Sequence, residues 1–207
     1  YLIDYFKKDI YPIENNNNND EEIIQISLIV KYLMFLEIAI KIPNVNKIVT
    51  SLPYSITEPF MYKLLDVEFD KLIMMCGKSF IDNLDNDNTK LSIMVNSYFK
   101  YNKVCDVTPD KFNPKPKVMS SLVTFEKKDI TKLNKKELIV ALLYKYRYMK
   151  VKNALKEILI KLDNITQRQA KDIISKYNID NNILDKLFDE LSTEEVLSVR
   201  EKINNNN

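Results

Sequence analysis

The residues best suited to chemistry stand in a short turn, Ser51-Leu52-Pro53-Tyr54, which follows a β-branched run at residues 47–50. The β-branched run predicts a strand, and the proline ends it because it has no backbone N–H to donate. Open α/β sheets bind their ligands at the carboxyl ends of strands. The turn would therefore present a hydroxyl group, backbone carbonyls and an aromatic ring where a ligand is expected. The alternative is a plain turn that happens to contain Pro-Tyr.

Composition restricts what else this chain of 207 residues could use for catalysis. It has no histidine, which removes Ser-His-Asp and Cys-His machinery and the ordinary His-ligated zinc or iron sites. A single glycine excludes the glycine-rich dinucleotide and phosphate-binding loops. Two cysteines cannot supply four sulfur ligands, so we predict no metal site. Because Cys76 and Cys105 lack the CxxC spacing, we expect both to be reduced, packed thiols in a reducing compartment.

Positive charge is concentrated in one part of the chain, although the net charge of the whole is only +2. Counting Lys and Arg against Asp and Glu gives −5 for residues 1–99, +3 for residues 100–130, +7 for residues 131–161 and −3 for residues 162–207. In the +7 segment, tyrosines alternate with basic residues in the order Tyr144, Lys145, Tyr146, Arg147, Tyr148. Such a surface neutralises phosphates and stacks on bases. The alternative is a solvated helix face with its aromatic residues in the core.

The periodicity of the chain predicts an α/β fold with a parallel sheet, followed by helices. Apolar or β-branched runs predict strands at residues 47–50, 71–76, 91–101 and 119–125. A helix is expected from residue 58 to residue 65, with Pro59 in its tolerated first turn. From residue 133 the period changes to 3.6, which predicts helices at residues 135–146, 150–162, 167–177, 183–187 and 193–202. Ser192 is the predicted N-cap of the last helix.

We therefore expect two domains, an α/β domain at residues 1–130 and an all-helical domain at residues 131–207. The apolar stretch at residues 23–40 contains Gln25 and the ionisable Lys31 and Glu37, which would be costly in a bilayer. We interpret this stretch as buried core rather than a membrane span. Because the chain begins at Tyr1, within an apolar-acidic run, we expect further sequence to precede it.

A second stretch, at residues 112–121, joins the turn in a recognisable series. Its alternating prolines stiffen the loop Phe112-Asn113-Pro114-Lys115-Pro116-Lys117, which presents one aromatic ring and two lysines. Together the turn and the loop resemble the KsgA family of ribosomal RNA adenine dimethyltransferases, whose signatures are an N-L-P-Y turn and an F-x-P-x-P-K-V-x-S loop. Further segments resemble the family in the same order: Thr89-Lys90-Leu91-Ser92, Arg147-Tyr148-Met149-Lys150-Val151-Lys152-Asn153-Ala154-Leu155 and Leu187-Phe188-Asp189-Glu190-Leu191-Ser192.

The resemblance implies a partial Rossmann-like methyltransferase sheet followed by a small all-helical C-terminal domain. It implies an enzyme that transfers methyl groups from S-adenosylmethionine to the exocyclic amines of two adjacent adenosines in small-subunit ribosomal RNA, with a role in ribosome biogenesis. The implied partner is this RNA or the pre-ribosomal small subunit. We expect a cytoplasmic monomer that does not bind membranes.

The resemblance also implies roles for individual residues. Tyr54 and Phe112 would hold a flipped adenine between their rings. Ser51 and the Pro53 region would accept hydrogen bonds from the adenine amine, and in amino-methyltransferases such acceptors localise the nitrogen lone pair. Ser51 and Asp4 would contact the cofactor, Asp4 at the position of the acid that holds the ribose. Basic side chains would follow the RNA phosphates by charge rather than by base reading, and these are Lys115, Lys117, Arg147, Lys150 and Lys152.

Two departures from the family pattern leave a second function open. Ser51 stands where the family has asparagine, and a hydroxyl group is shorter than an amide. The glycine-rich turn of the family's cofactor site has no counterpart in this sequence. The alternative function is a non-catalytic ribosome-assembly or RNA-binding protein derived from the same family.

Overall fold

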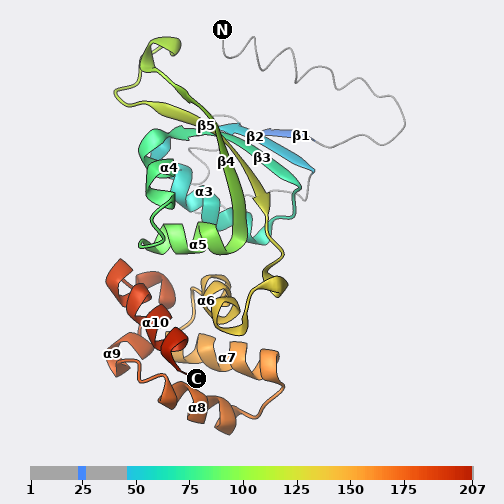
Figure 1. Ribbon diagram of the computed structural model, residues 1–207, viewed down its shortest axis with the longest axis vertical. Helices are drawn as coiled ribbons and strands as arrows, with labels where there is room; N and C mark the ends of the chain where they lie inside the picture. Colours follow the sequence, from blue (N-terminus) through green and yellow to red (C-terminus); the bar gives the residue numbers. More distant parts are fainter. Residues whose placement is uncertain (1–22, 27–45, 207) are drawn as a thin grey trace, which may run out of the picture. The chain divides into compact units, whose positions relative to one another are not determined.

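Five strands form one mixed sheet in this computed structural model, which describes residues 23–26 and 46–206 (Figure 1). The strand order is β1-β2-β3-β5-β4. β1 (Ile23–Ile26), β2 (Lys47–Ser51) and β3 (Lys71–Gly77) are parallel, whereas β5 (Ser120–Lys127) runs antiparallel to β3. β4 (Phe99–Val107) is the edge strand beside β5. The expected parallel sheet is confirmed for the first three strands, and the hairpin of β4 and β5 extends it in the antiparallel sense.

The predicted alternation of strand, helix and strand is confirmed between residues 47 and 77. β2 and β3 lie where strands were expected, and α3 (Thr57–Lys63) connects them. Pro59 occupies the first turn of α3, where its missing N–H leaves no helical hydrogen bond unmade. A short 3-10 segment, η2 (Leu64–Asp66), continues the helix. The α/β fold class is therefore confirmed.

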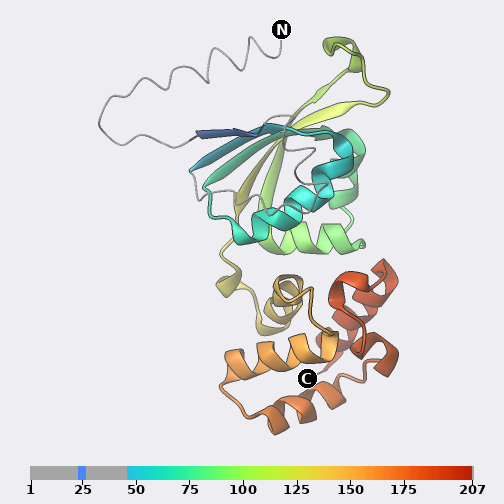
Figure 2. The same ribbon diagram turned by 180° about the vertical axis from the view of Figure 1, so that it is seen from behind.

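α3 lies against one face of the sheet, and the apolar core of this part is between them (Figure 2). Fully buried side chains come from α3 and the segment after it, from β2 and β3, and from β5: Phe60, Met61, Leu64, Ile48, Leu72, Met74, Val123 and Phe125. Burying one such side chain contributes about 1.5–3 kcal/mol relative to leaving it exposed. A one-residue slip of a strand would turn these side chains away from the helix, so their burial fixes the sheet register.

The chain divides into two compact units, which we describe separately. The first contains the described residues up to Asp82 together with Lys100–Lys127, and the second contains Asn83–Phe99 and the chain from Lys128 onward. α4 (Lys78–Leu84) begins in the first unit and ends in the second. The division into domains at residues 1–130 and 131–207 stays a prediction, because compactness alone does not define a folding domain.

The second unit is helical and begins most of its helices with side-chain caps. Its helices are α5 (Lys90–Tyr98), α6 (Lys135–Lys145), α7 (Val151–Asp163), α8 (Gln167–Lys176), α9 (Asn181–Leu184) and α10 (Thr193–Asn205). The predicted cap at Ser192 is confirmed, because its hydroxyl accepts the Glu195 N–H while the Glu195 carboxylate accepts the Ser192 N–H. The helix predicted at residues 183–187 is α9, which starts earlier because Asp180 caps it and ends before Leu187.

The strand predicted at residues 91–101 is wrong for most of its length, because that segment forms α5. The Thr89 side chain accepts the Ser92 N–H, and the Ser92 side chain accepts the Thr89 N–H, which starts a helix. Burial at adjacent positions, including Met94 and Val95, does not follow the alternation of a strand with one solvated face. β4 begins only at Phe99.

The two cysteines differ, so the expectation that both are packed is wrong for one of them. Cys76 lies buried in β3, and burial raises the pKa of its thiol to about 12. Cys105 is exposed, as are the residues on either side of it in the edge strand β4. Neither forms a disulfide.

Two expectations fall on the undescribed part of the chain. Asp4 and all but Ile23–Ile26 of the apolar stretch at residues 23–40 lie outside the described residues. Across residues 23–26 and 46–206, no helix is both long enough and apolar enough to cross a membrane.

Candidate active site

The sheet register brings the turn after β2 and the loop between β4 and β5 to the same edge of the sheet. Ser51, the last residue of β2, lies opposite Met75, and Gly77, the last residue of β3, lies opposite Ser120, the first residue of β5. The chain between β4 and β5 therefore leaves the sheet at the edge where the parallel strands end, and Figure 1 shows it projecting beyond the sheet. This edge is where open α/β sheets bind their ligands.

The turn after β2 is fixed by its backbone and by one buried side chain. Pro53 has φ −56° and ψ 137° and leads into a single 3-10 turn, η1 (Tyr54–Ile56). The Ile56 N–H donates to the Pro53 carbonyl at 3.0 Å, which leaves that oxygen one lone pair. Leu52 is buried, whereas Ser51 is exposed. The turn thus offers an exposed hydroxyl group and a partly used carbonyl at the end of the strand.

Tyr54 is held at two points of its ring. Its hydroxyl group is hydrogen-bonded to the hydroxyl group of Ser120, which is fully buried. Its ring lies against Gly77, since a Cβ atom added there would be 3.4 Å from the ring atoms Cγ and Cδ2. These contacts join the turn after β2 to the ends of β3 and β5. They fix the ring before any ligand arrives, which lowers the entropy lost on binding.

Phe112 lies in the loop that starts from the same edge. It follows a 3-10 segment, η3 (Pro109–Lys111), is half-buried, and donates its N–H to the Pro109 carbonyl at 3.2 Å. The next peptide bond, Asn113–Pro114, is cis. The turn that carries Tyr54 and the loop that carries Phe112 therefore start from the same edge of the sheet. In the part of the chain that is described, the two rings do not pair with each other directly.

The loop is anchored where it meets the strands. The Ser121 hydroxyl donates to the Asp106 carboxylate at 2.6 Å, and this bond, with a smaller contribution from Lys103, lowers the pKa of Asp106. The pKa of Asp110 is lowered to about 2 by hydrogen bonds from Thr108 and Lys111. Both carboxylates are therefore charged at neutral pH, close to the loop's lysines in sequence.

The basic residues expected to meet RNA differ in exposure. Lys115 and Lys117 are exposed on the loop of the first unit. In the second unit, Lys150 and Lys152 are exposed, and both pair with Asp185, at 3.9 Å in the case of Lys150. The hydrogen bond and charge of Lys152 lower the pKa of Asp185.

Arg147 departs from this pattern because it is only 6% exposed. Its guanidinium donates to the Tyr144 carbonyl at 3.3 Å and to the Tyr148 hydroxyl at 3.2 Å. It is thus engaged inside the helical unit rather than presented to solvent as a phosphate contact requires.

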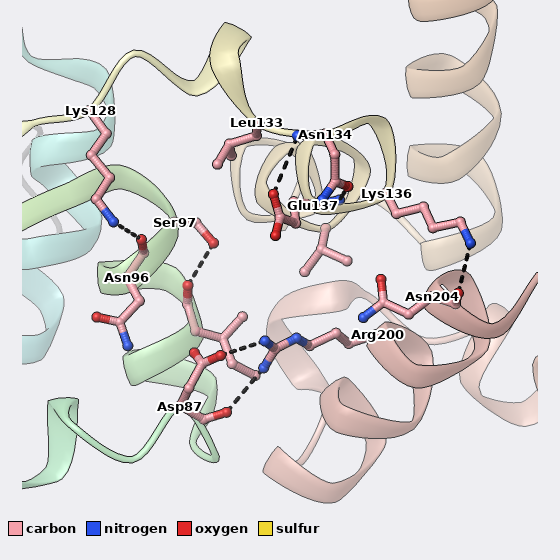
Figure 3. Close-up of a pocket in the computed structure, with 12 residues that line it drawn as sticks. Asp87, Asn96, Ser97, Lys128, Leu133, Asn134, Lys136, Glu137, Arg200 and Asn204 are labelled. Atoms are coloured by element: carbon pink, nitrogen blue, oxygen red, sulfur yellow. Dashed lines mark hydrogen bonds and ion pairs between the residues drawn. The ribbon is translucent and has the colours of Figure 1, made fainter.

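A polar pocket in the second unit, lined by α5, α6 and α10, carries none of the predicted site residues (Figure 3). Lys128 donates to the Asn96 carbonyl at 2.7 Å and Lys136 to the Asn204 carbonyl at 2.8 Å, each near the C-terminal end of a helix, where a cation is favoured. Arg200 pairs with Asp87. The cations of this pocket therefore complete helix ends and ion pairs of the fold.

Sequence reasoning assigned no role to Ser120, although it anchors Tyr54. Ser120 is the serine that closes the F-x-P-x-P-K-V-x-S pattern, and this was the signal that could have found it. Asp4, the residue expected at the cofactor ribose, lies outside the described residues. Within residues 23–26 and 46–206, no group of three or more His, Cys, Asp or Glu side chains is placed to hold a metal ion.

Comparison with known proteins agrees with the motifs. The family model for ribosomal RNA adenine dimethylase matches residues 3–204. The chain is 33% identical over 165 residues to the probable ribosomal RNA small subunit methyltransferase A of Pyrococcus abyssi, covering 77% of this chain and 59% of that protein. It is 32% identical over 210 residues to the Pyrococcus furiosus protein of the same name, covering 97% of this chain and 72% of that protein.

A solved structure is also similar. A dimethyladenosine transferase from Plasmodium falciparum matches 85% of this chain and 77% of its own, with a TM-score of 0.45 and 19% identity. The match of the family model to nearly the whole chain confirms the resemblance drawn from the turn and the loop. This chain belongs to the ribosomal RNA adenine dimethylase family.

Proposed function

We propose that this chain is a methyltransferase that moves methyl groups from S-adenosylmethionine to the exocyclic amines of two adjacent adenosines in small-subunit ribosomal RNA. It would act as a cytoplasmic monomer on this RNA or on the pre-ribosomal small subunit. The observation that carries the proposal is the position of Tyr54. Its ring is fixed at the carboxyl end of the parallel strands, at the edge from which the Phe112 loop projects.

Tyr54 and Phe112 would receive one adenine flipped out of its RNA stack. The face of the Tyr54 ring that lies on Gly77 is covered, so the base would stack on the opposite face. Phe112, half-buried on the loop, would close over the other side of the base. Stacking on an aromatic ring contributes about 1–3 kcal/mol per base and tolerates any sequence, so these rings position the base rather than select it.

The acceptors at the turn would orient the adenine amine. The exposed Ser51 hydroxyl and the remaining lone pair of the Pro53 carbonyl can each accept an N–H of that amine. Two accepted N–H bonds hold the nitrogen lone pair out of the ring plane and aim it outward. Orientation of this kind can supply much of the barrier reduction without a general base of unusual pKa.

The described residues fit the cofactor at one position. Ser51 ends a parallel strand with an exposed side chain, which is where a small ligand sits in sheets of this type. Asp4 remains the proposed ribose contact. When bound, S-adenosylmethionine supplies an electrophilic methyl group on a positively charged sulfur. The chain would hold the amine nitrogen in line with that methyl group and would accept hydrogen bonds from the N–H groups of the amine.

Four exposed lysines would follow the RNA backbone: Lys115, Lys117, Lys150 and Lys152. Asp185, the partner of Lys150 and Lys152, is a weak competitor, because exposed ion pairs contribute about 0–1 kcal/mol and phosphates can replace it. We do not retain Arg147 in this set, because its guanidinium is buried and bonded within the helical unit.

Transfer of labelled methyl groups tests the proposal directly. The chain is incubated with methyl-labelled S-adenosylmethionine and unmethylated small-subunit ribosomal RNA, and the modified nucleosides are separated. We expect label on the exocyclic nitrogen of adenosine and its loss in Tyr54→Ala. RNA binding without any incorporation would overturn the enzymatic proposal.

Ser51 favours a second candidate, the non-catalytic RNA-binding protein. Its hydroxyl reaches less far than the family's amide, so one of the two amine acceptors is weaker. Calorimetric titration with S-adenosylmethionine separates the two candidates. Saturable binding by the 207-residue chain, lost on removing the Ser51 hydroxyl, supports the enzyme, whereas no heat of binding together with retained RNA affinity supports the second candidate.

A further inference from the structure

Tyr148 has an exposure unlike that of any other aromatic residue in the described chain. Its side chain is 67% exposed, whereas the other aromatic residues within 46–206 are buried or half-buried. An aromatic ring left in water loses the free energy that burial would give it. The ring lies in the turn between α6 and α7, within the most basic segment of the chain.

Arg147 holds this ring from one side. The guanidinium carbon lies 4.5 Å from the centre of the Tyr148 ring, which is a cation–π contact. The same guanidinium donates to the Tyr148 hydroxyl at 3.2 Å. Because Arg147 is itself buried and also bonded to the Tyr144 carbonyl, it forms a fixed support. Arg147 therefore occupies one face of the Tyr148 ring, and the part of the ring that solvent reaches is the remainder.

The backbone on both sides of Tyr148 is fixed as well. A short antiparallel bridge joins Lys150 to Leu187. The Asp189 N–H donates to the Arg147 carbonyl at 2.9 Å, the Phe188 N–H to the Met149 carbonyl at 3.1 Å, and the Val151 N–H to the Lys186 carbonyl at 2.9 Å. The turn is thus tied to the 186–189 segment at three points. A ring on such a turn loses little conformational entropy when a ligand stacks on it.

The charges around the turn favour a polyanion. Lys145, Lys150 and Lys152 are exposed next to Tyr148 in the chain, and the single carboxylate of Asp185 is shared between the last two. Two further carboxylates, those of Asp189 and Glu190, are exposed on the neighbouring segment and offset part of this positive charge. Surfaces that bind single-stranded nucleic acids combine exposed cations with open aromatic faces in this way.

We propose that Tyr148 is a stacking platform for an unpaired nucleobase of the RNA that this chain binds, outside the site that holds the reacting adenine. Arg147 supports the ring, an unpaired base stacks on its open face, and Lys150 and Lys152 contact the flanking phosphates. The inference rests on the proposed RNA substrate, and it adds a second point of contact to it. Paired bases cannot use the platform because their faces are already stacked within the duplex.

A tryptophan at this position reports stacking directly, because the chain contains no other tryptophan. The Tyr148→Trp variant is titrated with a short single-stranded oligoadenylate, without S-adenosylmethionine, and its fluorescence is followed. We expect quenching that saturates with the RNA, and little quenching by the same strand annealed to oligouridylate. The matched control is Tyr101→Trp in the first unit, where the centre of the Tyr101 ring lies 5.8 Å from the centre of the Phe125 ring. RNA binding with equal quenching in both variants, or with none in Tyr148→Trp, would overturn the platform.

Substitution at the same position gives an independent readout. Tyr148→Ala should weaken binding of the single strand by about 5- to 150-fold, the range expected for one stacked base. Tyr148→Phe keeps the ring and should stay within about threefold of the parent chain. Equal losses in both variants, or no loss in either, would contradict stacking. No loss in either variant would instead favour a protein partner for the exposed ring. Since these measurements need no methyl transfer, they remain decisive even when the enzymatic proposal fails.

Discussion

Tyr54 and Tyr148 are both anchored through their hydroxyl groups, but the anchors differ in kind. Tyr54 is bonded to a buried serine and lies on the backbone of Gly77, at the carboxyl end of the parallel strands. The hydroxyl group of Tyr148 accepts a hydrogen bond from the buried Arg147, and its ring makes a cation–π contact with the same guanidinium, in a turn between two helices. The first ring is confined by neutral neighbours on two strands, Gly77 on β3 and Ser120 on β5, and the second is open to solvent. This contrast teaches that confinement suits a ring that must orient a reacting base, whereas exposure suits one that adds affinity.

The largest effect is expected from removing the confined ring. Tyr54→Ala should lower the rate of methyl transfer roughly 100-fold, because a base misplaced by about an ångström no longer aligns its amine. RNA affinity should fall less than the rate, because the cost of flipping the adenine out of its stack offsets much of the free energy gained by stacking on Tyr54. At Tyr148, where the base is already unpaired, the loss should appear in affinity. Initial rates at saturating RNA, with dissociation constants measured in parallel, check this split. A loss of affinity as large as the loss of rate would erase the distinction between the two rings.

Crowding the Tyr54 ring should have a smaller effect that depends on side-chain size. A Cβ atom at Gly77 meets the ring at an ordinary contact distance of 3.4 Å, so Gly77→Ala should be nearly neutral. Gly77→Leu adds atoms that the ring must move to admit, and we expect about a tenfold loss of rate. The two variants are compared by initial rates and by thermal unfolding. Equal rates for alanine and leucine would show that the ring position is not what catalysis requires.

The lysines near the open ring should affect affinity and its salt dependence. Lys150→Ala combined with Lys152→Ala should reduce the slope of log affinity against log salt by about one unit for each phosphate that is no longer neutralised. The rate at saturating RNA should not change. Lys171→Ala combined with Lys176→Ala, two exposed lysines of α8, is the matched control and should leave the slope unaltered. An unchanged slope in the first pair would remove these lysines from the RNA surface.

The smallest effect concerns the hydroxyl anchor of Tyr54. Tyr54→Phe keeps the ring but leaves the buried Ser120 hydroxyl without this partner, which should cost about 1 kcal/mol of unfolding free energy. Tyr54→Phe with Ser120→Ala removes both partners and should be closer to neutral than the sum of the two single changes. Denaturant unfolding of the four proteins measures this. Strict additivity would show that the two hydroxyl groups do not stabilise each other.

The sequence predicted the elements of the site better than their connections. Local patterns identified β2, the turn at Ser51 and the proline loop, because each depends on neighbouring residues. The hydrogen bond between Tyr54 and Ser120 joins residues 66 positions apart, and no local pattern encodes it. α5 was mistaken for a strand because an apolar run without clear alternation fits either element, and the cap at Thr89 decided the outcome.

Sequence patterns also could not predict which side chains would be exposed to solvent. Arg147 matched a basic motif position, yet it is buried in the fold, where the carbonyl of Tyr144 and the hydroxyl of Tyr148 accept hydrogen bonds from its guanidinium. Cys105 was expected to be packed, yet it lies on the exposed part of an edge strand. Both outcomes depend on which segments lie beside these residues in the fold, and not on the residues themselves.

The central claim is that Tyr54 and Phe112 hold the same base, and a double-mutant cycle on methyl transfer tests it most directly. Initial rates on unmethylated small-subunit ribosomal RNA are compared for the parent chain, Tyr54→Ala, Phe112→Ala and the double variant. If one base lies between the two rings, the double variant should be little slower than the slower single variant, because either change already frees the base. A double variant whose rate loss equals the product of the two single losses would contradict the claim, as would full activity in either single variant.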